Sequence, residues 1–171
     1  MNKKYTDLRI GRINRFYERL EKSYLGDYVL FRAEYGWSQD PVSFAEKGKL
    51  SYKPITEGDS WGEKWESAWF HLKGEVPAKW KGARVVVHLD FSGEGLVFDT
   101  HGKALQGITN GSIFDPNFKR IWVPLFDNCA GSEPVELWVE AAANSLFGIY
   151  TDSDPGEDAP SRYGNFPAKV E

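Results

Sequence analysis

The chain contains three histidines, His71, His88 and His101, as its only imidazole groups. In His88-Leu89-Asp90, two potential metal ligands stand two residues apart, so on a β-strand they would point to the same face. A zinc site takes at least three protein ligands as a rule, and no convergent third ligand is marked in the neighbouring sequence. We therefore predict that His88 and Asp90 are polar residues on the outer face of a strand, and that the chain holds no metal ion.

Carboxylate pairs are the usual machinery of glycoside hydrolysis, and Asp90, Glu94 and Glu140 are candidates by type. The sequence gives no separation between any two of them, and with 25 acidic residues some pair will always look suitable. A nucleophile elbow, a phosphate-binding loop and a dinucleotide-binding fingerprint are all missing from the sequence. The residues alone therefore indicate no catalytic group, and we expect the chain by itself to be inactive.

Four tryptophans, Trp61, Trp65, Trp69 and Trp80, lie within one short stretch. An indole can stack on the apolar face of a sugar ring, which makes such residues candidates for carbohydrate binding. The alternative is that they fill a hydrophobic core or contact a neighbouring domain, and large aromatic residues are mostly buried. Both interpretations stay open, with burial favoured.

An amphipathic helix is predicted from about Thr6 to Leu25, because five apolar residues recur at helical spacing: Ile10, Ile13, Tyr17, Leu20 and Tyr24. Thr6 is a suitable N-cap and Gly26 a suitable C-terminal glycine. We expect residues 1–26 to form a helix that packs on the following domain. Its polar face is basic and would either bind an anionic partner or simply be solvated.

After Gly26 the hydrophobic pattern changes to period two and remains so. The predicted strands are Tyr28 to Tyr35, Lys49 to Lys53, Ala68 to Val76, Arg84 to Phe91, Leu96 to Asp99, Leu105 to Ile108, Ile121 to Leu125 and Val135 to Glu140. His71 is expected to be a packed or hydrogen-bonded surface residue of a strand, and His101-Gly102 a tight turn. Short strands separated by turn residues indicate an antiparallel β-sandwich or jelly roll over residues 27–150. Residues 151–171 have linker composition, although Ala168 to Glu171 resemble the start of a strand.

Charge and composition exclude several classes of partner. The net charge is −4 and both signs are mixed along the chain, which argues against nucleic acid. No apolar run approaches the roughly 20 residues of a membrane helix, and the first 25 residues are too polar for a signal peptide. The single cysteine, Cys129, cannot form an internal disulfide. We predict a cytoplasmic protein without a membrane partner.

Three stretches resemble the N-terminal domain of α-mannosidases of glycoside hydrolase family 38, of the bacterial and fungal-vacuolar type. The first is WGEKWESAWFHLKGEVPAKWKGARVVVHLDFSGEGLVF, Trp61 to Phe98. The second, DTHGKALQGITNG, is similar to a family turn through Gly102, Gln106, Gly107 and Thr109. The third, VELWVEAAANSLFG, matches a family segment through Glu140, Ala142, Asn144, Leu146, Phe147 and Gly148. The three occur in the family's order and cover about half of the chain.

The resemblance implies a galactose-binding-like jelly roll from a zinc-dependent, retaining α-mannosidase. It implies that zinc belongs to a catalytic domain outside this chain, because His88-Leu89-Asp90 reproduces only the first three positions of the family's zinc motif. Residues 151–171 would then be a linker toward that domain. The expected partners are this catalytic domain and an α-mannoside oligosaccharide, with a homo-oligomer possible.

Three functions follow in order of preference: a structural or substrate-access domain of the enzyme, an autonomous carbohydrate-binding module, and a protein-interaction sandwich. The first predicts an apolar docking patch on the domain. The candidate residues for sugar stacking or interdomain contact are Trp61, Trp65, Trp69, Gln106, Thr109, Asn144 and Phe147.

Overall fold

The computed structural model describes residues 3–24, 26–62, 66–91, 93–109, 119–143 and 168–170. Its elements are α1 (Lys3–Tyr24), β1 (Val29–Leu30), β2 (Arg32–Ser38), β3 (Lys53–Ile55), β4 (Ser67–Glu75), β5 (Val85–Leu89), β6 (Glu94–Phe98), β7 (Ala104–Thr109), β8 (Trp122–Phe126), β9 (Pro134–Ala142) and β10 (Ala168–Val170), with 3₁₀ turns at Lys47–Lys49 and Ala78–Trp80.

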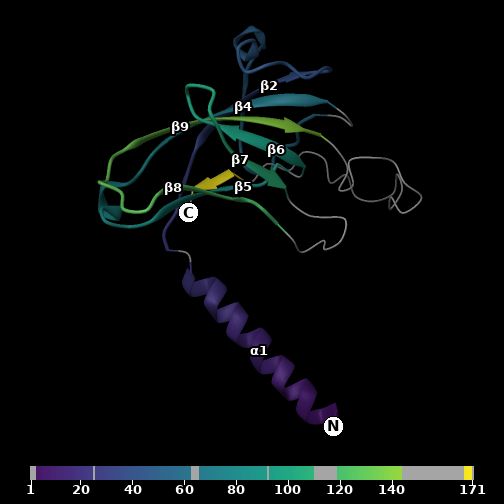
Figure 1. Ribbon diagram of the computed structural model, residues 1–171, viewed down its shortest axis with the longest axis vertical. Coiled ribbons are helices and arrows are strands. Elements are labelled where there is room, and N and C mark those ends of the chain that lie inside the picture. The colour runs from purple at the N-terminus through teal and green to yellow at the C-terminus, as the bar shows by residue number, and fades with distance from the viewer. Residues whose placement is uncertain are drawn as a thin grey trace, which may run out of the picture.

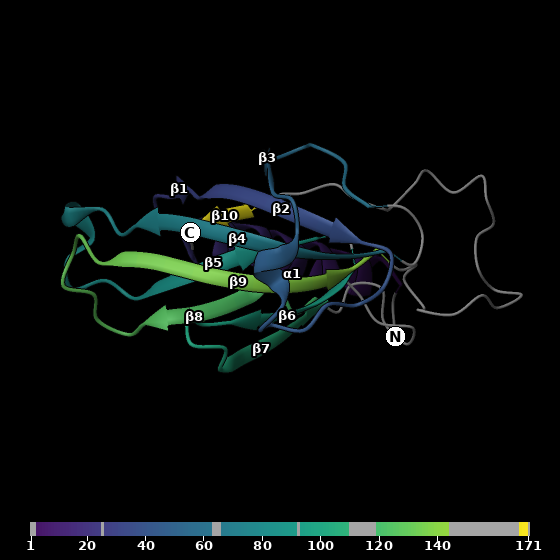
Figure 2. The ribbon, with the colours of Figure 1, turned by 90° about the horizontal axis from the view of Figure 1, so that it is seen from above.

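These strands form two antiparallel sheets that pack face to face (Figure 1). The larger sheet has the order β3-β2-β4-β9-β6-β7 and the smaller one β1-β10-β5-β8. Figure 2 shows β2, β4 and β9 side by side across the middle of the larger sheet. The predicted all-β sandwich with one N-terminal helix is therefore confirmed.

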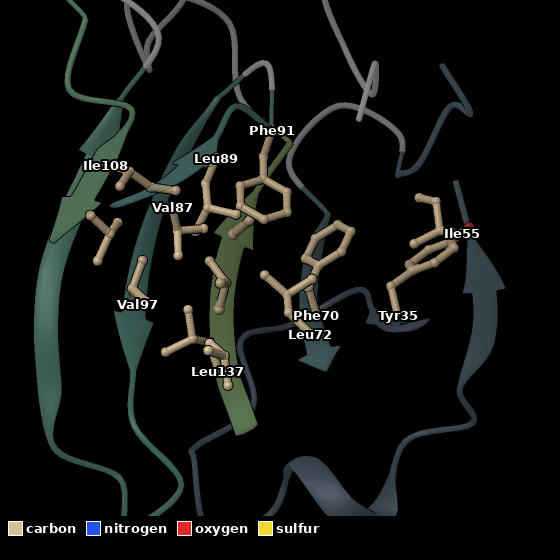
Figure 3. Close-up of a cluster of buried hydrophobic side chains, with 14 of the residues drawn as sticks. Tyr35, Ile55, Phe70, Leu72, Val87, Leu89, Phe91, Val97, Ile108 and Leu137 are labelled. Atoms are coloured by element: carbon tan, nitrogen blue, oxygen red, sulfur yellow. The ribbon is translucent and has the colours of Figure 1, made fainter. Parts of the chain in front are cut away.

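The hydrophobic core lies between the sheets and follows the alternation of the strands. Val85, Val87 and Leu89 of β5 are all buried, and Phe91 continues the same face. They oppose Ala68, Phe70 and Leu72 of β4 and Val135, Leu137, Val139 and Ala141 of β9. Figure 3 shows Phe70, Leu72 and Leu137 facing Val87 and Leu89 in this core. One face of each strand therefore supplies the core, as period two requires.

Most predicted strands appear within a few residues of their expected bounds. The weakest prediction, Lys49 to Lys53, is displaced, because Lys47–Lys49 form a 3₁₀ turn and β3 begins only at Lys53. The predicted turn at His101 is confirmed. Gly102 has φ +83°, and the Asp99 carboxylate accepts hydrogen bonds from the amides of His101 and Lys103. These two bonds lower the pKa of Asp99, the one from Lys103 contributing most.

The N-terminal helix forms as predicted, but its expected packing on the sandwich is not found. Its apolar stripe is open to solvent, with Ile10 51%, Ile13 54% and Tyr17 66% exposed. In Figure 1 the helix projects away from the two sheets. Hydrophobic periodicity identifies the apolar face of a helix but carries no information about which surface covers that face, which is why the packing prediction failed.

The last described residues of the chain form a strand inside the segment that was predicted to be a linker. Ala168–Val170 form β10, which lies between β1 and β5 and pairs Lys169 with Leu30 on one side and His88 on the other. These three residues belong to the smaller sheet, as their strand-like sequence suggested, and the linker prediction is wrong for them. Residues 151–167 lie outside the described part of the chain. Among the described helices, none is both long and apolar enough to cross a membrane.

Candidate functional site

The loop between β2 and β3, residues 39–52, folds over the outer face of the larger sheet. Phe44 from this loop contacts Trp69 of β4 and Phe98 of β6, with ring centroids 5.6 and 5.5 Å apart. The Trp69 indole N–H donates to the Val42 carbonyl at 2.7 Å. The close approach needs a glycine at position 36, since a Cβ there would lie 2.8 Å from the Cβ of Leu50. A second hydrophobic cluster therefore lies outside the main core.

This cluster decides the role of Trp69. Its side chain is only 2% exposed, so its indole faces are covered by the loop and by Phe98. A sugar in solvent cannot stack on a covered ring. In this conformation Trp69 is a packing residue, and its assignment as a sugar-stacking residue is not supported.

Tyr52 and Lys47 hold the same loop against Trp138 of β9. The Tyr52 hydroxyl donates to the Lys47 carbonyl at 3.0 Å, and its ring meets Trp138 edge to face. The Lys47 ammonium lies 3.5 Å from the Phe44 ring centroid and 4.5 Å from that of Trp138, both within the range of a cation–π contact. Burial lowers the pKa of Lys47. Burial, and secondarily the negative charge of Glu34, raises the pKa of Tyr52 to about 12.

The raised pKa of Tyr52 predicts a loss of stability in alkali. Between pH 10 and about 12 the unfolded chain releases this proton while the folded chain retains it. The folded state then binds more protons, so the free energy of unfolding falls as the pH rises through this window, and the full contribution is present below pH 10. The difference in tyrosinate absorbance between wild type and Tyr52→Phe should titrate near pH 12. A midpoint near 10, with circular dichroism showing the fold intact, would contradict the burial of this hydroxyl.

His71 joins three strands on the outer face of the larger sheet. Its Nδ1 lies 3.0 Å from Glu34 Oε1 of β2, and its Nε2 lies 2.7 Å from Glu136 Oε1 of β9. The ring stacks on Trp138 at a centroid distance of 3.8 Å. Since an ionised carboxylate only accepts hydrogen bonds, both nitrogens donate at once in the imidazolium form. The predicted packing and hydrogen bonding of His71 are confirmed. Its predicted surface position is wrong, because the residue is only 7% exposed.

An open pocket of about 340 Å³ lies where β2 ends and β4 begins. It is lined by Tyr35, Trp37, Lys53, Ser60, Trp61, Gly62 and Glu66. Trp61 is 2% exposed and fixed in place by a hydrogen bond from its indole N–H to the Phe91 carbonyl at 3.1 Å. It therefore packs into the core as a wall of the pocket and presents no open indole face. Trp37, in contrast, is 51% exposed.

Sequence reasoning missed Trp37, although one feature could have identified it. Trp37 shares a strand face with Ala33 and Tyr35, and Tyr35 is buried while Trp37 is exposed. The predicted strand ended at Tyr35, so Trp37 was assigned to no element, whereas the alternation of β2 places its indole on the core side. Its position near the end of a strand, with Ser38, Gln39 and Asp40 directly after it, was the available indication of exposure.

The other candidate residues take structural positions or fall outside the described chain. Gln106 donates from its side-chain amide to the Trp122 carbonyl at 2.7 Å, which links β7 to β8. Thr109 ends β7, where its backbone forms a bridge with Arg120. Trp65, Asn144 and Phe147 lie outside the described residues, so their assignment stays a prediction.

The remaining histidine and carboxylates form no metal site. His88 stacks on the Trp122 ring at 4.4 Å on the outer face of β5, as predicted for a strand residue. Burial raises the pKa of Glu140 on β9. Glu94, two positions along the neighbouring strand, shares its sheet face. Across the ranges that the structure describes, no group of three or more histidine, cysteine, aspartate and glutamate side chains could hold a metal ion.

Comparison with known proteins adds a family match. Residues 32–163 match the model of the family described as "Alpha-mannosidase, jelly roll domain". Alpha-mannosidase G of Dictyostelium discoideum is 32% identical over 111 residues, 65% of this chain and 10% of that protein. Human Alpha-mannosidase 2C1 is 30% identical over 109 residues, 63% of this chain and 10% of that protein. The chain thus spans about a tenth of the length of these relatives.

The chain also aligns with a solved structure. That structure is a β-glucuronidase of Ruminococcus gnavus, which aligns over 68% of this chain and 20% of its own with a TM-score of 0.42 and 9% sequence identity.

Proposed function

The chain belongs to the family of α-mannosidase jelly roll domains, and from this premise we propose that it is the non-catalytic N-terminal domain of a zinc-dependent, retaining α-mannosidase. The observation that carries the proposal is the family match over residues 32–163, which contains every strand from β2 to β9. The two relatives are α-mannosidases in which the matching part is about a tenth of the protein. The hydrolytic groups are accordingly proposed to lie in the remainder of the enzyme.

Zinc has no place among the described residues of this chain, because they contain no group of three potential ligands. We therefore assign the metal to the catalytic domain and derive no chemical step from this chain. The jelly roll would then contribute by placing other parts of the enzyme, and it would take no part in the chemistry. It would hold the catalytic domain and shape the approach of an α-mannoside oligosaccharide to it, in the cytoplasm.

A docking surface for the catalytic domain is available on the larger sheet. Leu96 of β6 and Leu105 of β7 are 36% and 42% exposed. Leu96 pairs with Gly107, two residues from Leu105, and the register shifts at Leu105, so the two exposed leucines lie on neighbouring strands at the β7 edge. Exposed apolar side chains that are adjacent on one surface are typical of a protein contact. We propose this edge as the side that faces the catalytic domain.

The proposal predicts that the native protein carries α-mannosidase activity that the isolated chain lacks. An antibody raised against the purified chain should precipitate activity toward p-nitrophenyl α-mannoside from an extract of the source cells. The precipitate should lose this activity after treatment with a zinc chelator and regain it with added zinc. The purified chain should show no turnover with or without zinc.

Two results would contradict the proposal. One is a precipitate that contains the chain, identified by mass spectrometry, but no α-mannosidase activity above that obtained with pre-immune serum. The other is turnover by the purified chain itself, because the hydrolytic groups would then lie within these 171 residues.

A further inference from the structure

A pocket lies between β2, β3 and the start of β4, away from the proposed docking edge of the domain. Its volume of about 340 Å³ is at the lower end of the range for small-molecule sites. That size suits one ring of a ligand rather than an extended oligomer. The pocket is open to solvent, and Trp37, one of its lining residues, is 51% exposed.

The inner wall of the pocket is tightly packed against the core. Trp61 packs edge to face on Phe70 at 4.9 Å, and Tyr35 stacks on Phe70 at 5.6 Å. In Figure 3, Tyr35 lies beside Ile55 at the β2–β3 side of the core. Gly62 has φ +68°, and a Cβ there would stand 3.0 Å from the Cβ of Ala143. Because these side chains are already packed, we expect binding to cost little conformational entropy at this wall.

The groups at the mouth of the pocket suit a neutral, polyhydroxylated ring. Trp37 is half exposed, and an accessible indole ring packs well against the C–H face of a pyranose. Lys53 and Ser60 can donate hydrogen bonds, and the Glu66 carboxylate can accept them from ring hydroxyls. One cation and one anion line the same space, so a strongly charged ligand would meet a like charge. The chemistry therefore favours an uncharged sugar over a phosphate or an amine.

We propose that this pocket binds one pyranose ring of a neutral α-mannoside, stacked on Trp37 and hydrogen-bonded by Lys53, Ser60 and Glu66. The pyranose follows from the pocket, whereas the choice of an α-mannoside rests on the proposed function. The site differs from the one expected from sequence, since Trp37 replaces the buried Trp61 and Trp69 as the stacking residue. A single ring held by one aromatic face and a few hydrogen bonds binds with a Kd on the order of 1 mM.

The test is a titration of the ¹⁵N-labelled chain with methyl α-mannoside, followed by the indole N–H resonances in two-dimensional NMR spectra. The Trp37 resonance is assigned by its loss in Trp37→Ala. In the wild type this resonance should shift and saturate by roughly 20 mM ligand. Trp37→Ala should weaken binding roughly tenfold or more, measured on the resonances of neighbouring residues, and Trp37→Phe should retain part of the affinity because an aromatic face remains.

Two further variants separate the pocket from general effects on the fold. Leu105→Ala also removes an exposed apolar side chain, but from β7 and outside the pocket, and should bind as the wild type does. Glu66→Gln keeps the shape of the side chain and removes its charge. Because hydrogen bonds to a charged acceptor are stronger than neutral ones, it should bind several-fold more weakly.

Each outcome bears on one part of the proposal. Absence of any saturable shift at roughly 20 mM in the folded wild type overturns the proposal, as does binding that Trp37→Ala leaves unchanged. Equal or tighter binding of methyl β-galactoside or methyl β-glucoside overturns the assignment to α-mannosides. None of these results touches the activity in the antibody precipitate, so a failure here is distinguishable from a failure of the proposed function.

Discussion

Replacement of Phe70 by alanine is expected to lower the free energy of unfolding by about 3–5 kcal/mol. Phe70 is 0% exposed, and its ring contacts those of Tyr35, Trp61 and Phe91 at centroid distances of 5.6, 4.9 and 4.5 Å. The truncation removes buried apolar surface and leaves a cavity that these three rings, fixed by their own strands and contacts, can fill only in part. Urea denaturation followed by tryptophan fluorescence measures the loss.

A loss of this size approaches the total stability of an ordinary domain, so Phe70→Ala could be largely unfolded before urea is added. Phe70→Leu keeps the measurement possible, because it leaves a smaller cavity and should cost roughly 1–2 kcal/mol. The matched control is Leu105→Ala, which removes a 42% exposed side chain and should change stability by no more than about 0.5 kcal/mol. If Phe70→Ala and Leu105→Ala were equally stable, the sandwich core would be misplaced.

The strand segments and the core-facing residues of this domain follow from information that is local in the sequence. The segment from Val85 to Leu89 is recognisable because one property, alternating hydrophobicity, sets both its backbone conformation and its buried face. The turn at Gly102 is equally local, since a residue with positive φ is needed there and Asp99 supplies the side-chain acceptor. Such elements are predictable without knowledge of their neighbours.

The outer face of the larger sheet was not predictable, because long-range contacts cover it. Alternation along β4 places Trp69 and His71 on the outside, which suggests solvent or a ligand. The β2–β3 loop instead brings Phe44 onto Trp69, and two neighbouring strands supply Glu34 and Glu136 to His71. No pattern within β4 specifies what a loop some thirty residues earlier will cover.

The pocket was missed because Trp37 is exposed, whereas Trp69 and His71 were misjudged because other parts of the chain cover them. The pattern of β2 assigns Trp37 to the core side with Tyr35, yet only Tyr35 is buried. Burial on that side depends on how far the packed region reaches along the strand, which is a property of the whole sandwich. The helix α1 shows the same limit, since its stripe of Ile10, Ile13 and Tyr17 is correct as a pattern and remains exposed.

Replacement of Trp69 by alanine is the second large effect, with an expected loss of about 3–5 kcal/mol in the free energy of unfolding. The indole is 2% exposed, contacts Phe44 and Phe98, and donates to the Val42 carbonyl at 2.7 Å. Its removal opens a cavity under the β2–β3 loop and leaves that carbonyl without its donor. Trp69→Phe should cost less, roughly 1–2 kcal/mol, because a ring remains and the hydrogen bond is the principal loss. Urea denaturation checks both values, and faster hydrogen exchange in residues 39–52 would locate the damage.

Trp69 and Trp37 together distinguish a packing residue from a binding residue. Trp37→Ala removes a 51% exposed ring, so it should cost within about 1 kcal/mol of stability while it weakens binding of the mannoside. Trp69→Phe should show the reverse, with lower stability and unchanged affinity, since its ring lies on the outer sheet face and does not line the pocket. If Trp69→Phe kept the stability of the wild type and lost the sugar, then Trp69 would be the stacking residue after all. The loop that covers it would then have to open in solution.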